Sequence, residues 1–346
     1  MIAGSGDPST MKALVLQQPG QASIETVPEP LAANGDILLK VRMVGFCGSD
    51  LNSFRGLNPL ISYPRIPGHE VSATVVEANG NPRLSVGVDV ALSPYTSCGT
   101  CASCRRGRPN ACQCNQTLGV QRNGALTEFV VMPPDKLYPA KLAPKELCLV
   151  EPLTVGFHAA ARGRVTAGDT VAIFGCGGVG LGAVAASKSR GARTIGVDVD
   201  DDKLELARVV GGAHTINTLR ESLHDRLLEM TEGRGPDVVI EAVGTPATFR
   251  AAVEEVAFTG RVVYIGYAKE PVSYETRLFV QKELDILGSR NAQPEDFHAV
   301  IRLLEAGRFP VDQAVSLVVS LEEAPGALSS WSENPSKFKK ILVCLD

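Results

Sequence analysis

Two patterns of hydrophobic and polar positions divide the chain. Before about Glu151, short apolar runs of β type are separated by prolines and glycines, and no strong helical period of useful length occurs. The alternation in these runs is irregular but suits a curved β-barrel. The clearest predicted strands are 36–44, 71–76 and 126–131.

From Gly156 onward, strand-like runs alternate with helical stretches. This alternation is typical of βαβ units and predicts an α/β fold with a doubly wound parallel sheet. A further helix after Ser289 leads to a short β-rich tail, so the α/β block is predicted to interrupt a β-rich domain. The predicted strands are 170–174, 194–197, 238–242, 262–265 and 285–287, and the predicted helices are 179–189, 202–210, 220–231, 246–256 and 294–305.

Composition narrows the class of protein. A length of 346 residues predicts roughly two domains, and 44% hydrophobic residues are enough for full-sized cores. The net charge of −4 argues against nucleic acid or an anionic membrane as a partner. No apolar run approaches the roughly 20 residues needed to span a bilayer. Residues 1–10 lack the regions of a secretory signal and are interpreted as a flexible leader, with Met11 as an alternative start.

Four of the nine cysteines form the run C-x2-C-x2-C-x7-C. Such clusters are zinc sites more often than disulfide frameworks in a reducing cytosol, which favours a cytoplasmic metalloprotein. Four thiolates close a tetrahedral shell around zinc, so the site is predicted to be structural. Cys114 is interpreted as a bystander or as a substitute for the last ligand. The predicted ligands are Cys98, Cys101, Cys104 and Cys112.

A glycine motif predicts a dinucleotide site. The sequence G-x-G-x-x-G follows the apolar strand 170–174 and opens a helix, which is the setting for a pyrophosphate at a helix N-terminus. Gly175 is expected to allow the tight turn, Gly177 the approach of the pyrophosphate, and Gly180 close packing of helix on strand. The residues assigned to this site are Gly175, Gly177, Gly178, Val179 and Gly180.

The next predicted strand ends at Asp198, about 20 residues further on. An acidic residue at this place hydrogen-bonds the adenosine ribose and repels a 2′-phosphate, which favours NAD over NADP. Lys203 can reach the same ribose or be solvated at a helix start. The alternative interpretation is a glycine-rich α/β turn that binds no nucleotide.

Further residues of metal-ligand type lie outside the cysteine run. Cys47 lies in G-F-C-G-S-D, His69 and Glu70 lie in P-G-H-E, and Glu151 lies where the two patterns meet. Taken singly, such residues are more often core or surface positions than ligands. Together, a thiolate, an imidazole and a carboxylate leave zinc an open position, as a catalytic site requires.

These motifs, in this order, resemble the zinc-dependent medium-chain alcohol dehydrogenase family from about Met11 to the C-terminus. The resemblance implies a GroES-like β-barrel catalytic domain at 11–157 and 290–346 and a Rossmann domain at 158–289. It also implies a catalytic zinc and a structural zinc. The run E-P-L-T-V-G-F-H from Glu151 resembles the polyol (sorbitol) dehydrogenase branch, because true alcohol dehydrogenases carry a cysteine at this position.

The same resemblance assigns roles to individual residues. It places the catalytic zinc on Cys47, His69 and a carboxylate, with Glu151 as the first choice and Glu70 as the second. Ser49 matches the hydroxyl that takes the substrate proton in this family. A histidine that many relatives carry further along this helix is absent here, so water or the cofactor ribose is expected to replace the outer proton relay.

The substrate is predicted from weaker signals. The stretch 288–297 resembles enzymes that act on sugar acids and polyols, such as the gulonate and galactonate 5-dehydrogenases. Within it, Arg290 can reach the nicotinamide or its phosphates. Arg122 can pair bidentately with a substrate carboxylate or be an exposed loop arginine. The predicted reaction transfers hydride from a secondary alcohol of a sugar acid or polyol to NAD, in a homo-oligomer that is a tetramer or a dimer.

Other functions remain open at this point. Within the enzymes, an L-threonine 3-dehydrogenase or a general secondary-alcohol dehydrogenase carries similar motifs. Outside the enzymes, a catalytically silent binding or structural protein can share the fold. The presence of Cys47, His69 and Glu151 argues against the silent protein, because loss of zinc ligands is its usual sign.

Overall fold

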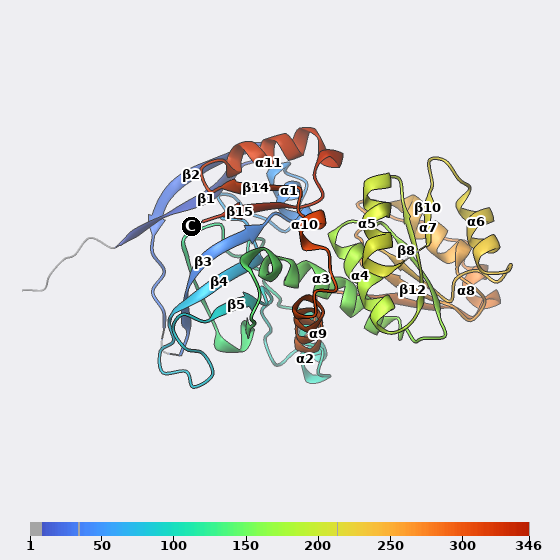
Figure 1. Ribbon diagram of the computed structural model, residues 1–346, viewed down its shortest axis with the longest axis horizontal. Coiled ribbons are helices and arrows are strands. Elements are labelled where there is room, and N and C mark those ends of the chain that lie inside the picture. The colour runs from blue at the N-terminus through green and yellow to red at the C-terminus, as the bar shows by residue number, and fades with distance from the viewer. Residues whose placement is uncertain (1–8, 34, 213, 346) are drawn as a thin grey trace, which may run out of the picture. The chain divides into compact units, whose positions relative to one another are not determined.

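Two β-sheet systems organise the chain, which the computed structural model describes at residues 9–33, 35–212 and 214–345 (Figure 1). Of the predicted leader, residues 1–8 lie outside these described residues.

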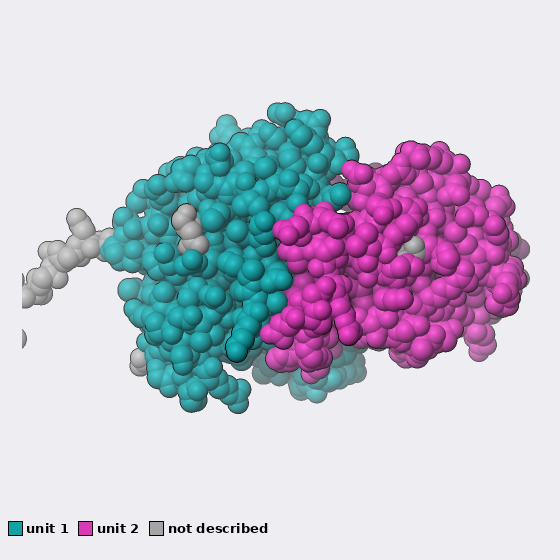
Figure 2. All heavy atoms as spheres, viewed as in Figure 1, with its two compact units in different colours: residues 1–151, 315–346 teal, residues 152–314 magenta. Residues whose placement is uncertain are grey.

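The chain divides into two units, residues 1–151 with 315–346 and residues 152–314 (Figure 2). The segment 290–314, predicted as part of the β-rich domain, therefore lies in the second unit. Its helix α9 (Pro294–Glu305) buries one apolar face there, including Phe297. The carboxylate of Asp296 on this helix lies 2.9 Å from Nδ1 of His158, another residue of the second unit.

The first unit is built on a seven-stranded sheet and a separate hairpin. Strand β15 runs antiparallel to β3, with Val343 opposite Val44, so the C-terminal tail returns to the first unit. Strand β3 alternates buried and half-buried positions, which places Leu39 and Val41 in the core. The strand order in the sheet is β14 (Leu317–Ser320), β15 (Ile341–Cys344), β3 (Ile37–Gly45), β4 (Glu70–Glu77), β5 (Asp89–Leu92) and β7 (Leu137–Pro139). The seventh strand, β6 (Phe129–Met132), also pairs with β3. The hairpin consists of β1 (Thr10–Gln18) and β2 (Gln21–Pro28).

Short helices complete the first unit: α1 (Gly48–Phe54), α2 (Ala102–Arg105) and α11 (Ala324–Glu333). Helix α11 was not predicted, since the sequence after the helix 294–305 predicts a β-rich tail. It buries Ala324, Ala327 and Leu328. This stripe has helical spacing but contains only one large apolar side chain, so its hydrophobic period is weak in the sequence.

The second unit contains a six-stranded parallel sheet in the order β10-β9-β8-β11-β12-β13. The chain enters the sheet at the central strand β8 and adds β9 and β10 toward one edge. It then returns to add β11, β12 and β13 on the other side of β8, which is the doubly wound arrangement that the sequence predicts. Helices such as α4 and α5 pack against it (Figure 1). The bounds are β8 (Thr170–Phe174), α4 (Gly178–Ser189), β9 (Arg193–Asp198), α5 (Asp201–Gly211), β10 (His214–Asn217), α6 (Leu223–Met230), β11 (Val238–Glu241), α7 (Pro246–Glu255), β12 (Arg261–Tyr264), α8 (Arg277–Gln281), β13 (Asp285–Gly288) and α10 (Val311–Ala314).

Other elements also differ from the prediction, and β10 and α3 show why. Strand β10 was not predicted, because its four residues alternate too briefly to show a period. Helix α3 (Pro144–Arg162) begins before Glu151, although no helix was expected there. Its residues 147–150 are all buried, so they form an apolar run without a polar face, and Pro152 inside the helix further disguises the pattern.

Candidate functional site

The first candidate metal centre lies where β3 ends and β4 begins. Cys47 follows β3 and caps α1, while His69 and Glu70 stand at the start of β4. Antiparallel pairing puts Gly45 opposite Glu70. A side chain at Gly45 would overlap the Glu70 carboxylate, so glycine is required for this close approach. Ligand atoms of Cys47, His69 and Glu70 all lie within 4.8 Å of one another.

Asp50 joins the two segments that carry these ligands. Its carboxylate accepts hydrogen bonds from the backbone N–H of Cys47 at 2.8 Å and from that of Gly68 at 3.2 Å. It is 1% exposed. No role is predicted for Asp50 from the sequence, although a carboxylate at the third helical position after a cap is a recognisable capping signal.

Two carboxylates flank this centre, and each has a different partner. Glu151, on α3, accepts a hydrogen bond from the hydroxyl of Tyr95. Glu70 is buried and accepts two hydrogen bonds from the ammonium of Lys340, at 2.7 and 2.6 Å. The Lys340 ammonium also donates to the carbonyl of Phe46 at 3.1 Å. Neither Tyr95 nor Lys340 carried any signal in the sequence, because each is distant along the chain from its partner.

The electrostatics of the centre follow from burial and these pairs. Burial raises the pKa of Glu70, against the opposing effect of Lys340. Burial acts to lower the pKa of His69, but the charges of Cys47 and Asp50 outweigh it and raise this pKa well above 6.5. The centre therefore concentrates negative charge, which a divalent cation would compensate.

The residues fit a zinc ion by their chemistry. Nδ1 of His69 is buried and has no hydrogen-bond partner among the described residues. Buried polar atoms are normally satisfied, and a metal ion that took this nitrogen as a ligand would satisfy it. Thiolate, imidazole and carboxylate are ligands that zinc takes in open sites. The set of ligand atoms within 4.8 Å of one another includes Glu70, which the sequence ranks second as the carboxylate ligand of the catalytic zinc. This set does not include Glu151.

Ser49 lies in the first turn of α1, two residues after Cys47. Its Oγ is buried and has no partner within the described part of the chain. A hydroxyl that is shielded from water and unpaired is available to a bound group.

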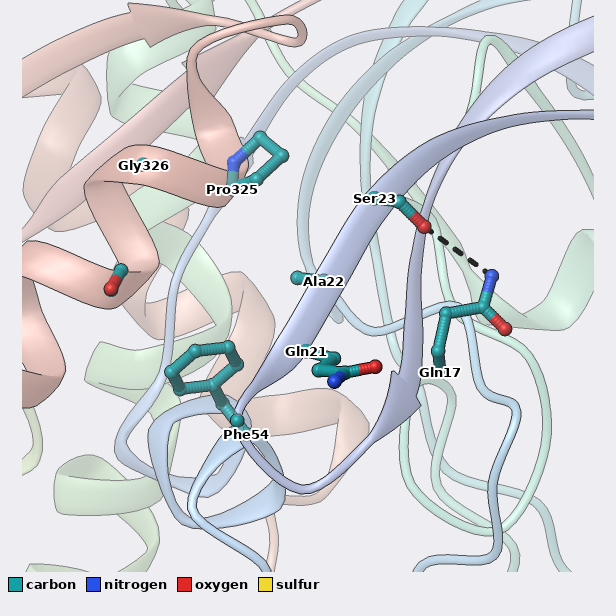
Figure 3. A pocket seen from close by; sticks show the side chains of 9 residues that line it. Gln17, Gln21, Ala22, Ser23, Phe54, Pro325 and Gly326 are labelled. Atoms are coloured by element: carbon teal, nitrogen blue, oxygen red, sulfur yellow. Dashed lines mark hydrogen bonds between the residues drawn. The ribbon is translucent and has the colours of Figure 1, made fainter.

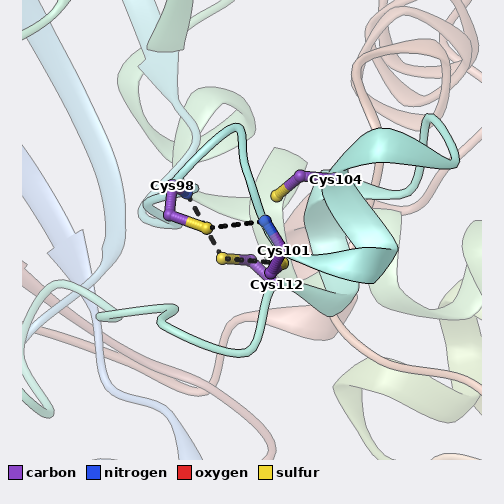
Figure 4. Close-up of side chains that lie close together, drawn as sticks. All are labelled: Cys98, Cys101, Cys104 and Cys112. Atoms are coloured by element: carbon purple, nitrogen blue, oxygen red, sulfur yellow. Dashed lines mark hydrogen bonds between the residues drawn. The ribbon is translucent and has the colours of Figure 1, made fainter.

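The second candidate metal centre is the cysteine cluster around α2 (Figure 4). The sulfurs of Cys101 and Cys112 lie 3.9 Å apart. Tetrahedral zinc with bonds of about 2.3 Å would separate its sulfur ligands by about 3.8 Å. Hydrogen bonds from Thr100 and the backbone N–H of Cys101 lower the pKa of Cys98 to about 7. Those from Ser103 and backbone groups lower the pKa of Cys101 to about 5. Cys114 is exposed and does not belong to the group of four.

The glycine motif forms the turn from β8 into α4. Gly175 has φ +91°, a conformation that favours glycine. A side chain at Gly180 would overlap the carbonyl of Gly175, so Gly180 allows the helix to pack closely on this turn. Gly177 caps α4, and an added Cβ there would meet no atom within 4 Å. The backbone is therefore open at Gly177, where a pyrophosphate would approach the helix N-terminus formed by Gly178 and Val179.

Asp198 stands at the carboxyl end of β9, beside this turn. One carboxylate oxygen accepts the backbone N–H of Cys176 at 2.7 Å, and the other accepts those of Val199 and Asp200. The ammonium of Lys203 lies 4.0 Å from Asp200 in the first turn of α5. Asp198 and the glycine turn are thus held together as one surface that suits a dinucleotide.

The remaining residues singled out by the sequence lie on several elements. Arg290 follows β13. His158 pairs with Asp296. Arg122 lies in a loop with its guanidinium near the carbonyl of Pro94.

A separate hollow of about 510 Å³ lies beside the β1–β2 hairpin (Figure 3). Gln17, Phe54 and Pro325 are among the residues that line it, and Gln17 donates a hydrogen bond to Ser23 at its edge. None of its lining residues is charged or of metal-ligand type. Among the described residues, no helix has the length and apolar character to cross a membrane.

The fold and its two ligand clusters define a two-domain zinc-binding dehydrogenase. The family model for the alcohol dehydrogenase GroES-like domain matches residues 33–142, and that for zinc-binding dehydrogenases matches residues 178–306. The chain belongs to the zinc-dependent medium-chain alcohol dehydrogenase family, in the branch of polyol and sugar-acid dehydrogenases. It is an oxidoreductase, which excludes the catalytically silent alternative.

Named relatives cover nearly the whole chain. Sorbitol dehydrogenase of Bacillus subtilis is 33% identical, over 97% of this chain and 98% of its own length. L-galactonate-5-dehydrogenase of Escherichia coli is 31% identical, over 89% and 91%. A crystal structure of an Escherichia coli alcohol dehydrogenase complexed with NADH superposes with a TM-score of 0.89 at 29% identity, covering 97% of this chain and 100% of that one.

Proposed function

We propose that this enzyme transfers hydride from a secondary hydroxyl of a sugar acid or polyol to NAD, and reduces the ketone in reverse. The observation that carries the proposal is the mixed cluster of Cys47, His69 and Glu70, with the Glu151 carboxylate also in the first unit. Such a set leaves zinc an open position for a substrate oxygen. The similarity to sorbitol and L-galactonate dehydrogenases supports this substrate class.

When bound, zinc supplies Lewis-acid chemistry that eases loss of a hydroxyl proton, and NAD supplies the hydride acceptor. Cys47 and His69 hold the metal together with a carboxylate. The Oγ of Ser49, which is buried and has no partner among the described residues, would accept the substrate proton while its own proton passes on to water or the cofactor ribose. Asp50 positions both ligand segments through their backbone, so the site is ordered before substrate arrives.

Two observations bear on the choice of carboxylate. The grouping within 4.8 Å supports Glu70. The two hydrogen bonds from Lys340 occupy the oxygens of Glu70, which supports Glu151. Zinc analysis of Glu70→Gln and Glu151→Gln distinguishes them: the variant that loses about one zinc per chain identifies the ligand, provided that both variants stay folded.

NAD is the proposed cofactor, held by the glycine turn with Lys203 and Arg290 at its margins. Asp198 supports NAD over NADP, because a carboxylate there repels a 2′-phosphate. The test of the whole proposal is a panel of L-galactonate, sorbitol, L-threonine and ethanol with each cofactor at matched concentration. Preference for ethanol or L-threonine would overturn the substrate class, and preference for NADP would overturn the cofactor.

We further propose a cytoplasmic homotetramer or homodimer. No cysteine of the described chain forms a disulfide, which supports a reducing compartment. The oligomeric state follows the family resemblance, and light scattering of the purified enzyme measures it directly. A monomer at micromolar concentration would contradict it.

A further inference from the structure

Arg122 carries a half-buried guanidinium that the protein leaves unsatisfied. Its Nε is buried and has no hydrogen-bond partner within the described chain. Its one hydrogen bond runs from Nη2 to the carbonyl of Pro94, at 3.5 Å, the outer limit for such a bond. The residue as a whole is partly exposed, so a ligand can reach its outer atoms.

The charge of Arg122 is also uncompensated. Burial lowers its pKa, and among the described residues no acidic group opposes that effect. Taking a cation partly out of water without an anion beside it is costly, and proteins normally pair such a group. An arginine kept in this state is prepared for an anion that the protein itself does not supply.

The position of Arg122 relates it to the first metal centre. The carbonyl of Pro94, which it touches, also accepts the backbone N–H of Leu118 at 3.0 Å. Arg122 forms a β-bridge with Leu118, and Thr117 forms one with Tyr95. The hydroxyl of Tyr95 in turn donates to Glu151. A continuous set of contacts within the first unit therefore joins Arg122 to the carboxylate beside the zinc ligands.

We propose that Arg122 binds an anionic group of the substrate, a carboxylate or a phosphate monoester, and so selects acidic sugars over neutral polyols. The two terminal nitrogens form an edge of the guanidinium that can receive two oxygens side by side. The inference rests on the proposed function, because it names the substrate that the secondary-alcohol site receives. It narrows that proposal from sugar acids and polyols to anionic sugar derivatives.

Arg65 provides a matched control. Its Nε is also buried without a partner, but its terminal nitrogens donate to Asn123 at 3.3 Å and to Ser62 at 2.9 Å. Two of its donor groups are thus already used by neutral side chains. Removal of its charge tests whether any arginine near this loop has the same effect.

The experiment compares the zinc-loaded wild-type enzyme with Arg122→Gln, Arg122→Lys and Arg65→Gln. The probes are L-galactonate, galactitol 1-phosphate and neutral sorbitol, with binding measured by calorimetry and turnover by NADH formation. We expect Arg122→Gln to weaken binding of the preferred anion and raise its KM at least about tenfold, with sorbitol changed less than about threefold. Arg122→Lys should restore part of the affinity, which also guards against a folding defect. The wild-type preference between the two anions identifies carboxylate or phosphate as the group bound.

Three outcomes would overturn the role of Arg122. The wild-type enzyme could bind sorbitol as tightly as both anions, or Arg122→Gln could lose affinity equally for all three probes. Arg65→Gln could also show the same loss of affinity as Arg122→Gln. Failure of all three probes to bind would do so as well. If the probes bind with this pattern but none reduces NAD, the proposed function fails while the anion site stands, so the two failures are distinguishable.

Discussion

The ammonium of Lys340 lies 2.7 and 2.6 Å from the two carboxylate oxygens of Glu70, across 270 positions of sequence. Both residues are buried, and the pair forms because β15 returns to lie beside β3. The pair holds one of the two carboxylates near Cys47 and His69 in a defined place. Burial of an ion pair is tolerated only when both charges are present, so each residue depends on the other.

Lys340→Met should therefore lower the free energy of unfolding by about 3–5 kcal/mol, because it leaves the Glu70 carboxylate buried without a counter-charge. Denaturant titration measures the loss. Lys141→Met, which removes an exposed lysine of the same unit, serves as the control and should change little. The double variant Lys340→Met/Glu70→Gln should recover part of the loss, and strictly additive effects would contradict the coupling.

Removal of the cysteine cluster should affect stability before activity. Cys98→Ser is expected to lower the zinc content from about two to about one per chain and to lower the melting temperature, because a closed thiolate shell ties a loop together. Cys114→Ser is the matched control, since this exposed thiol lies outside the group of four. Metal analysis and thermal denaturation report both effects. Loss of zinc in Cys114→Ser would show that the ligand set is different.

Asp198→Ala should relax the discrimination between NAD and NADP at least about tenfold, because the carboxylate that repels a 2′-phosphate is gone. The ratio of kcat/KM for the two cofactors measures it. Asp202→Ala, an exposed aspartate on α5, should leave that ratio unchanged. An unaltered ratio in Asp198→Ala would count against its assignment to the ribose.

The pair of Asp169 and Arg261 predicts an acid-sensitive contribution to stability. Burial acts to raise the pKa of Asp169, but the N–H and hydroxyl of Thr166 and the guanidinium of Arg261 lower it below 3.8. A carboxylate whose pKa is lower in the folded state stabilises the fold above its ordinary pKa, and the contribution is lost as the pH falls through the lower value. The stability difference between wild type and Asp169→Asn should be constant near neutral pH and shrink below pH 3.8.

The exposed residue Asp135, which lies 3.4 Å from its neighbour Lys136, provides the comparison. Asp135→Asn should show little difference from wild type at any pH, because solvent screens an exposed pair. Urea titrations at a series of pH values measure both variants. If the stability difference between wild type and Asp169→Asn increased as the pH fell, its sign would contradict this mechanism.

Features coded by local spacing were predictable. The turn from β8 into α4 needs glycines within a few residues, and β8 itself spans the predicted 170–174. The four clustered cysteines converge because short loops bring them together. Helix α11 was not predicted because its buried stripe is made mostly of alanine. Helix α3 was not predicted because its apolar run and internal proline resemble a strand followed by a break.

The sequence by itself determined the family, the ligand types and the dinucleotide turn, since each depends on residue identity at short range. Only the tertiary structure decided which distant side chains meet: Lys340 with Glu70, Tyr95 with Glu151, and Asp50 with the backbone of both ligand segments. It also left Arg122 without a counter-charge among the residues that the structure describes. These relationships depend on strand pairing and burial across the whole fold, where desolvation makes each polar contact matter, and no local pattern encodes them.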